Sequence, residues 1–154
     1  MLLKPEERPE IWHQTGDKNF DSTRQLYDSL GVQAKLSPFI EDMAQAYGWA
    51  NMVLCRAGAS TVAELCAVGL GAVLVPYPYA VDDHQTANAN FMVKNNAALC
   101  IQQSDLSANR LVEVIRQFTQ SPEKRVAMAQ AAYQLRKVNV AAKFYEILCD
   151  VIDN

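Results

Sequence analysis

Short, almost entirely apolar runs alternate with longer amphipathic runs along the sequence. The short runs predict β-strands, because an apolar run of about four to eight residues between turn signals is typical of a buried strand. Five such strands are expected, at 10–15, 32–37, 51–55, 72–77 and 97–102. The longer runs predict helices at 19–31, 40–50, 60–69, 83–96, 107–120, 122–137 and 140–152.

This order of elements predicts an α/β fold, in which a Rossmann-like parallel sheet carries helices on both faces. Strands without polar alternation are buried on both faces, as in parallel sheets covered by helices. Strands that alternate with helices form right-handed βαβ units. In such doubly wound sheets, ligands bind outside the carboxyl ends of the strands. Binding residues are therefore expected in the loops that follow the strands.

The beginning of the chain departs from this pattern. Residues 1–9 resemble the end of a helix or a linker, whereas a domain of this kind usually opens with a buried strand and a glycine-rich turn. We therefore expect a fragment that lacks the first strand and its glycine-rich loop.

Composition narrows the class of function. Half of the 154 residues are hydrophobic, 20% are charged, and the formal net charge is −3. No nucleic-acid partner is expected, because such partners are held mainly by an excess of positive charge. No run approaches the roughly 18 apolar residues of a membrane span, and no secretion signal opens the chain. These features predict a cytoplasmic protein.

The cysteines and histidines do not predict a metal site. No CxxC pair occurs, and neither histidine stands at metal-binding spacing from a cysteine. His13 lies near the end of the strand predicted at 10–15 and is interpreted as structural. We expect reduced thiols that pack as small hydrophobic groups at four positions, Cys55, Cys66, Cys100 and Cys149.

The stretch CRAGASTVAELCAVG, residues 55–69, combines a strand end, a glycine and a helix start. Gly58 permits unusual dihedral angles and close approach of a ligand. The first amides of the helix, at 59–61, then suit a phosphate or diphosphate. Glu64 is placed to accept hydrogen bonds from ribose hydroxyls. The alternative is a capping box, in which Thr61 caps the helix and Glu64 reaches back to the cap amide.

Two other loops hold candidate binding residues. After the strand at 72–77, His84 and Gln85 fall in the first helical turn and can hydrogen-bond sugar hydroxyls, with Asp83 as the expected helix cap. The alternative is an ordinary solvated helix start.

The loop after the second strand contains Phe39 and Ile40. These two side chains either belong to the core or form an apolar slot for a flat base.

The runs FIEDMAQAYGWANMVLCRAGASTVAEL and GLGAVLVPYPYAVDDHQTANA, together with IWHQTG, resemble the C-terminal domain of the MurG-type glycosyltransferases over about residues 10–150. The resemblance implies a GT-B fold, in which two Rossmann-like domains face a cleft and the nucleotide sugar binds mainly to the C-terminal one. It assigns the whole chain, 1–154, to one partial C-terminal domain.

The resemblance also assigns roles to residues. Phe39 and Ile40 match the uracil pocket, the turn at 58–61 matches the diphosphate site, and Glu64 matches the acid that binds ribose. Glu64 is then expected both to cap the helix and to bind. The implied donor-binding residues are Phe39, Ile40, Gly58, Ala59, Ser60, Thr61, Glu64, His84 and Gln85.

His84 and Gln85 match a polar pair at the donor sugar, and some family members have glutamine in place of His84. Arg56 is expected to be structural or to support the site. No catalytic residue is assigned, because the general base is expected in the absent N-terminal domain.

The implied activity is an inverting transfer of N-acetylglucosamine from UDP-GlcNAc to undecaprenyl-diphospho-muramyl-pentapeptide, which converts lipid I to lipid II in peptidoglycan synthesis. No metal and no cofactor are implied, and Asp82 and Asp83 are interpreted as a helix cap. The full-length enzyme is expected to be peripheral on the cytoplasmic face of the inner membrane, and this chain alone is expected to be inactive.

The last helix raises a separate expectation. In the family, the segment that matches 140–154 packs on the N-terminal domain. We therefore expect its apolar face, with Phe144, Ile147 and Leu148, to be repacked or used in self-association.

Three other functions fit the sequence less well. A stand-alone UDP-sugar-binding module with a separate partner chain is disfavoured by the missing first glycine-rich loop. An NAD-binding Rossmann domain is disfavoured because no GxGxxG follows the first strand. A related nucleotide-sugar enzyme, such as a lipid glucosyltransferase or a 2-epimerase, is disfavoured by the run at 37–47 and by His84 and Gln85.

Overall fold

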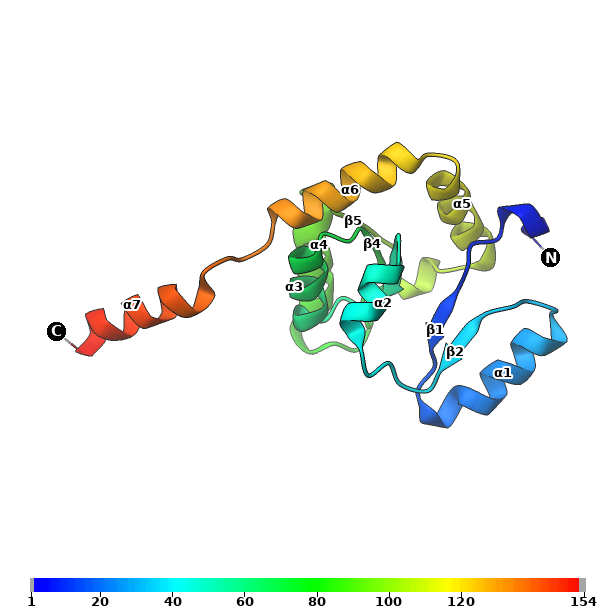
Figure 1. Cartoon of the computed structure of the whole chain (residues 1–154), viewed down its shortest axis with the longest axis horizontal. Helices are drawn as coiled ribbons and strands as arrows, with labels where there is room; N and C mark the ends of the chain where they lie inside the picture. The colour runs from blue at the N-terminus through cyan, green and yellow to red at the C-terminus, as the bar shows by residue number, and fades with distance from the viewer. Residues whose placement is uncertain (1, 153–154) are drawn as a thin grey trace. The chain divides into compact units, whose positions relative to one another are not determined.

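The computed structural model describes residues 2–152, apart from the side chains of residues 81, 146 and 152. The chain divides into two compact units. Figure 1 labels the helices and strands of both. The first unit comprises Met1–Asn51 and Asp105–Lys124, and the second comprises Met52–Ser104 and Arg125–Asn154.

The first unit contains a two-stranded parallel sheet. Its elements are η1 (Pro5–Glu7), β1 (Trp12–Gln14), η2 (Asp17–Asn19), α1 (Phe20–Ser29), β2 (Lys35–Ser37), α2 (Met43–Trp49) and α5 (Ala108–Thr119). Trp12 pairs with Lys35 across the sheet, and the Lys35 ammonium lies 3.2 Å from the centroid of the indole. Trp49 meets Trp12 edge-to-face at 5.8 Å, so α2 packs against β1.

The second unit contains a three-stranded parallel sheet in the order β3-β4-β5. Its elements are β3 (Val53–Cys55), α3 (Ala59–Val68), β4 (Ala72–Leu74), η3 (Val81–Asp83), α4 (His84–Val93), β5 (Ala98–Cys100), η4 (Gln103–Asp105), α6 (Pro122–Gln134) and α7 (Val140–Ile152). The central strand β4 is buried along its whole length. The largest fully buried side chains of this unit are Leu65, Leu74, Met92, Val73 and Pro76, and two of them, Val73 and Leu74, belong to β4.

Local sequence explains where several helices begin and end. Asp42 caps α2, because its carboxylate accepts a hydrogen bond from Gln45 N at 2.8 Å. Ser107 caps α5 in the same way through Arg110 N at 3.1 Å. Gly69 ends α3 in the left-handed conformation, with φ of 68°, which glycine adopts without a steric penalty.

The α/β class predicted from the sequence is confirmed, and every predicted strand and helix is present in the predicted order. The strands form two parallel sheets, one in each unit, with strand β3 paired to β4 and strand β1 paired to β2. The thiols also agree with the prediction, since all four cysteines are free, although only Cys66 is fully buried.

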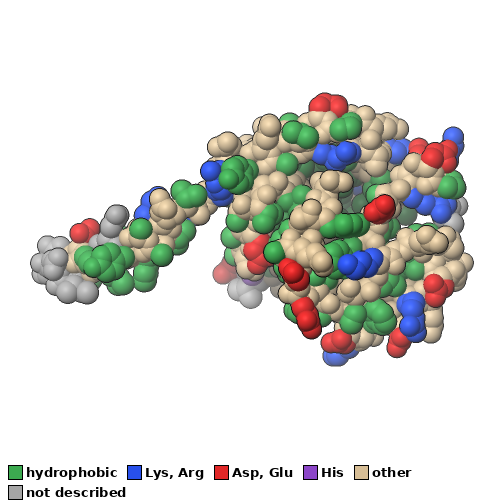
Figure 2. Space-filling view, viewed as in Figure 1, with side chains coloured by type: hydrophobic (Ala, Val, Ile, Leu, Met, Phe, Trp, Pro, Cys, Tyr) green, Lys and Arg blue, Asp and Glu red, His purple; other side chains and the backbone are tan. Residues whose placement is uncertain are grey.

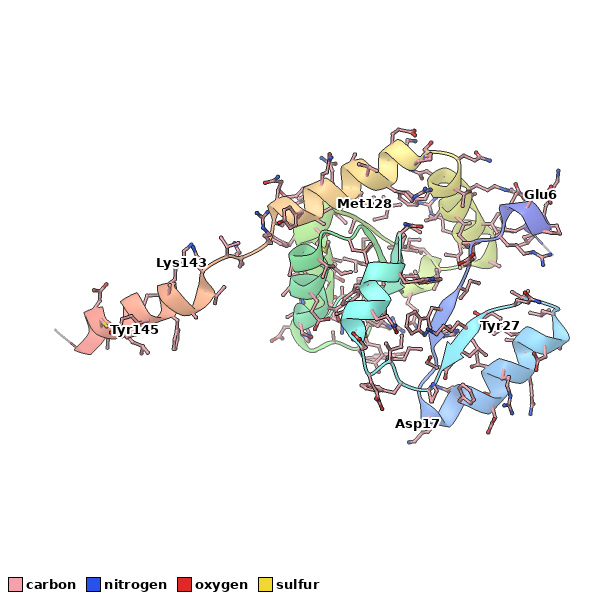
Figure 3. The ribbon with its side chains drawn as sticks, in the orientation of Figure 1. Glu6, Asp17, Tyr27, Met128, Lys143 and Tyr145 are labelled. Carbon is pink, nitrogen blue, oxygen red and sulfur yellow. The ribbon has the colours of Figure 1, made fainter. Side chains whose placement is uncertain are left out.

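Apolar side chains on α7 are exposed. They include Phe144, Tyr145, Ile147, Leu148 and Val151, which are 43% to 70% exposed. Figure 2 shows hydrophobic side chains along this helix, and Figure 3 marks Lys143 and Tyr145 on it. Within residues 2–152, no helix combines the length and apolar character needed to cross a membrane.

Candidate functional site

The carboxyl edge of the sheet in the second unit brings three loops together. The backbone ladder continues past the strands there, since Val75 N donates to Cys55 O at 2.8 Å and Ile101 N donates to Leu74 O at 2.9 Å. The loop after β3 leads into α3, and the loop after β4 leads into α4. This is the edge at which ligands bind in parallel α/β sheets.

Helix α3 begins at this edge without a side-chain cap. Gly58 is the N-cap residue and accepts the first helical bond, from Val62 N at 2.9 Å. The amides of Ala59, Ser60 and Thr61 therefore form the first turn, where backbone donors have no partner within the helix. The helix dipole adds positive potential at the same end, so this turn suits an anion.

The capping box predicted for this helix is wrong. The N-cap is Gly58, three residues before the Thr61 that the pattern suggested, so Thr61 lies inside the first turn and cannot be the N-cap. Gly58 has φ of −63°, so the turn does not use the unusual dihedral angles that glycine permits. A Cβ atom added at Gly58 would approach only Thr61 Oγ1, at an ordinary 3.6 Å. The turn itself therefore does not require glycine.

Glu64 lies on α3 and is exposed. It follows Ser60 by four residues and Thr61 by three, so the three side chains share one face of the helix. The carboxylate thus lies about one turn further along the helix than the first-turn amides, on the face that Ser60 and Thr61 share. This arrangement offers donors for a phosphate and an acceptor for hydroxyl groups one turn away.

Gln85, in the first turn of α4, joins the two loops. Its Oε1 atom accepts hydrogen bonds from Ala57 N at 3.2 Å and from Tyr77 N at 2.9 Å. Asn88, three residues later on the same face of α4, donates through Nδ2 to Ala57 O at 3.0 Å. Gln85 was predicted as a sugar ligand, and the structure shows that its oxygen is held by the protein backbone.

Arg56 joins the loops from the other direction. Its Nη1 donates to Val75 O at 3.3 Å and Pro76 O at 3.0 Å, and its Nη2 donates to Gln103 Oε1 at 2.7 Å. The guanidinium carbon also lies 5.5 Å from the centroid of the Tyr77 ring. The sequence suggested a supporting role for Arg56 but did not reveal Asn88 or Gln103. The spacing of Asn88 from Gln85, one helical turn, was the signal available for Asn88.

The start of α4 differs from the prediction. His84 is its first residue and is exposed. Asp83 occupies the N-cap position, but its side chain makes no capping hydrogen bond. Asp82 and Asp83 both have left-handed backbone angles, with φ of 49° and 51°. N-cap residues normally have extended backbone, so the prediction of an aspartate cap is wrong for this geometric reason.

The two residues predicted to contact the base belong to the first unit. Phe39 is 66% exposed, and the backbone N of Ile40 donates to Gln14 Oε1 at 3.0 Å. Both lie in the loop between β2 and α2. His13, interpreted as structural, has its Nδ1 3.3 Å from the Tyr27 hydroxyl.

Two concavities are lined by none of the predicted binding residues. One, of about 400 Å³, lies in the first unit against α1 and β2. The other, of about 280 Å³, lies in the second unit where the end of α3 meets α6. Neither concavity therefore supports the predicted site.

Two of the thiols lie at the last positions of strands that lead into this edge. Burial raises the pKa of Cys55 to about 11. Burial also raises the pKa of Cys100, and the Asp83 carboxylate adds to that increase. Both thiols are therefore protonated at neutral pH and are not poised as nucleophiles.

Comparison with known proteins assigns the chain to a family. Residues 3–144 match the glycosyltransferase family 28 C-terminal domain, and the chain belongs to this family. The crystal structure of MurG from Acinetobacter baumannii superposes on 92% of the chain with a TM-score of 0.80 and 38% sequence identity.

Curated relatives carry one name, UDP-N-acetylglucosamine–N-acetylmuramyl-(pentapeptide) pyrophosphoryl-undecaprenol N-acetylglucosamine transferase. The protein from Acidithiobacillus ferrooxidans is 52% identical over 136 residues, which is 88% of this chain and 38% of the relative. That from Nitrosococcus oceani is 47% identical over 150 residues, which is 97% of this chain and 42% of the relative. The chain therefore spans about two fifths of the length of these relatives.

Proposed function

We propose that the chain is the donor-binding part of an inverting N-acetylglucosaminyltransferase that uses UDP-GlcNAc. The observation that carries this proposal is the uncapped first turn of α3 with Glu64 on the same helix face. The amides of Ala59, Ser60 and Thr61 bind the diphosphate, and Glu64 accepts hydrogen bonds from the ribose hydroxyls.

The remaining donor contacts follow the predicted assignments. Phe39 and Ile40 contact the uracil ring, and His84 contacts the sugar. Gln85 contacts the sugar through Nε2, because its Oε1 accepts from the amides of Ala57 and Tyr77. Exposure of Phe39 and His84 is compatible with these roles, because a ligand can reach both side chains.

The acceptor is the undecaprenyl-diphospho-muramyl-pentapeptide named in the relatives, bound through a domain outside this chain. That domain also supplies the general base, so the chain alone is inactive. The C4 hydroxyl of the acceptor attacks the anomeric carbon, and UDP leaves. The amides at the start of α3 stabilise the charge that develops on the diphosphate, because fixed dipoles aimed at a developing charge need no reorganisation during the reaction.

The same proposal gives α7 a role. The helix packs on the N-terminal domain of the complete enzyme, which acts on the cytoplasmic face of the inner membrane. The exposed Phe144, Ile147 and Leu148 support this, because exposed apolar groups that recur along one helix are typical of an interaction surface. Without that domain, the same face mediates self-association.

The ribose role of Glu64 can be tested with two nucleotides that differ in one hydroxyl group. We expect UDP to bind this chain more tightly than 2′-deoxy-UDP, because the deoxy compound leaves Glu64 with one hydrogen bond fewer. Glu64→Ala should weaken UDP binding by about 1–3 kcal/mol. In that variant, the two nucleotides should bind equally.

Isothermal titration calorimetry measures the affinity of each nucleotide for the wild type and for Glu64→Ala. Glu113→Ala on α5 serves as the control for loss of an exposed carboxylate. Equal loss of affinity for both nucleotides in Glu64→Ala, with their ratio unchanged, would show that Glu64 does not bind the ribose 2′-hydroxyl.

A further inference from the structure

The backbone of Ala57 is held on both sides by side chains of α4. Gln85 accepts from its amide at 3.2 Å, and Asn88 donates to its carbonyl at 3.0 Å. Ala57 is fully buried and immediately precedes Gly58, the N-cap of α3. The position of the α3 start is therefore tied to α4 through Ala57.

The same Gln85 oxygen also holds the loop after β4, through Tyr77 N at 2.9 Å. Two N–H donors converge on one atom, and only an oxygen can accept both, so the orientation of the amide is determined. The Nε2 group of Gln85 is then directed away from these two backbone donors.

Arg56 fastens the same loop at the two preceding residues. A planar guanidinium presents several donors in a fixed fork, which lets it hold Val75 O, Pro76 O and Gln103 Oε1 at once. Arg56 and Ala57 are neighbours, so the turn before α3 is fixed to the loop after β4 at two adjacent residues.

We propose that Arg56 and Gln85 form a lock that holds the Gly58 turn in its binding geometry before any donor arrives, and that both act as positioning residues. The lock is defined by these two side chains and their bonds to Ala57, Val75, Pro76, Tyr77 and Gln103. Its functional part rests on the proposed donor site. A turn that is already ordered loses little conformational freedom on binding. An ordered turn therefore binds the diphosphate more tightly than a mobile turn would.

The role of the Gln85 oxygen can be tested with two variants, one that lacks an accepting oxygen and one that keeps it. Gln85→Leu removes the acceptor, whereas Gln85→Glu retains a carboxylate oxygen that can accept from both backbone amides. Without nucleotide, we expect amide hydrogen exchange of Ala57 and Tyr77 to become at least tenfold faster in Gln85→Leu and to return toward the wild-type rate in Gln85→Glu. The control is Gln117→Leu on α5, which replaces an exposed glutamine in the other unit.

Arg56 is tested by a change that keeps its charge. Lysine cannot reproduce the fork of the guanidinium. Arg56→Lys should therefore weaken UDP binding about as much as Arg56→Leu, by roughly tenfold. The urea denaturation midpoint of Arg56→Lys should stay close to that of the wild type. A wild-type affinity in Arg56→Lys would overturn the positioning role of Arg56, because charge alone would then be sufficient.

The hydrogen-exchange result does not depend on nucleotide binding, so the two proposals can fail separately. Unchanged exchange of Ala57 and Tyr77 in Gln85→Leu would overturn the lock even if UDP binds. Faster exchange with unchanged UDP affinity would show that the lock has no positioning role. Absence of UDP binding to the wild-type chain, with the expected exchange pattern, would instead overturn the donor site and with it the positioning role.

Discussion

At the carboxyl edge of the second sheet, buried residues stand next to polar residues whose side chains bond to the backbone. Cys55 and Ala57 stand one residue on either side of Arg56, yet the first is a half-buried thiol and the second is completely buried. Arg56 and Gln85 satisfy the backbone groups of this region, which would otherwise be costly to bury. The backbone geometry of the edge therefore depends on the side chains of Arg56 and Gln85.

Cys55 gives a prediction about pH. Its pKa is raised from 9.0 to about 11 because burial disfavours the thiolate. The folded state therefore holds this proton more tightly than the unfolded state, and the resulting stability is fully present below about pH 9 and is lost as the pH rises toward 11. We expect alkylation of Cys55 by iodoacetamide, followed by mass spectrometry, to rise with a midpoint near pH 11 in the folded protein.

The unfolded protein in urea serves as the control, with a midpoint near 9. A thiol that is alkylated with the same midpoint in both states would contradict the burial of Cys55.

At this scale, the sequence predicted the positions of the site residues better than their bonds. Glu64, His84 and Gln85 were expected at one sheet edge, and the structure places them on the helices that begin there. The capping box failed because a T-x-x-E pattern also occurs inside a helix, and the start of α3 depends on the backbone of Gly58. The bonds of Gln85 could not be predicted, because they join segments 8 and 28 residues apart in the sequence.

Among the elements of the second unit, α6 packs on the short connection between α3 and β4. A Cβ atom at Gly69 would lie 3.0 Å from Tyr133 Cβ, and one at Gly71 would lie 2.8 Å from Met128 Cγ. Both glycines therefore allow close approach of α6, and Met128 is marked on this helix in Figure 3. These two contacts hold α6 against the connection between α3 and β4.

Gly71→Ala tests that contact. We expect the substitution to lower the free energy of unfolding by about 1–3 kcal/mol, because the new methyl group overpacks against Met128. The double variant Gly71→Ala/Met128→Ala should lose less than the sum of the two single changes, since shortening Met128 makes room for the methyl group. Urea denaturation measures all three variants. Strict additivity of the two effects would contradict the packing of Met128 on Gly71.

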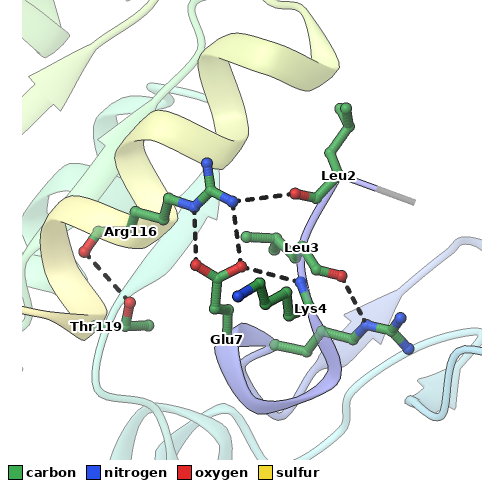
Figure 4. Close-up of polar contacts among 7 residues, drawn as sticks. Leu2, Leu3, Lys4, Glu7, Arg116 and Thr119 are labelled. Atoms are coloured by element: carbon green, nitrogen blue, oxygen red, sulfur yellow. Dashed lines mark hydrogen bonds and ion pairs between the residues drawn. The ribbon is translucent and has the colours of Figure 1, made fainter.

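In the first unit, η1 is attached to α5 by a two-pronged ion pair (Figure 4). Arg116 donates through Nε to Glu7 Oε1 at 3.0 Å and through Nη2 to Glu7 Oε2 at 3.1 Å, and Nη2 also donates to Leu2 O at 3.2 Å. The hydrogen bonds from Arg116 are the main cause of a lowered pKa at Glu7, and the bond from the Lys4 amide adds to it. The segment before β1 is thereby linked to a helix more than 100 positions later.

This ion pair predicts a titration. The pKa of Glu7 lies below its ordinary 4.5, so the stability it provides is present above that pH and is lost as the pH falls through the lowered value. NMR titration of the Glu7 carboxyl carbon should show a midpoint below 4.5 in the wild type. Arg116→Ala should raise this midpoint, and Arg110→Ala, which removes a partner of Glu113, should not. The same Glu7 midpoint in all three proteins would exclude the pair in solution.

For the whole molecule, strand and helix order followed from hydrophobic pattern alone, because buried parallel strands and amphipathic helices leave distinct periods in the sequence. The division into two units was not predicted, since it depends on contacts between segments distant in sequence, such as that between η1 and α5. In the proposed function, the acceptor-binding site and the general base belong to a domain outside residues 1–154. The central claim for this chain is therefore donor binding rather than transfer.

Calorimetric titration of the chain with UDP, UDP-GlcNAc and NAD tests that claim most directly. We predict saturable binding of both UDP compounds, in the millimolar range or tighter, and none of NAD, because the proposed site takes a single nucleoside diphosphate with uracil as its base. Absence of UDP binding, or equal binding of NAD, would contradict the account of this edge as a UDP-sugar site.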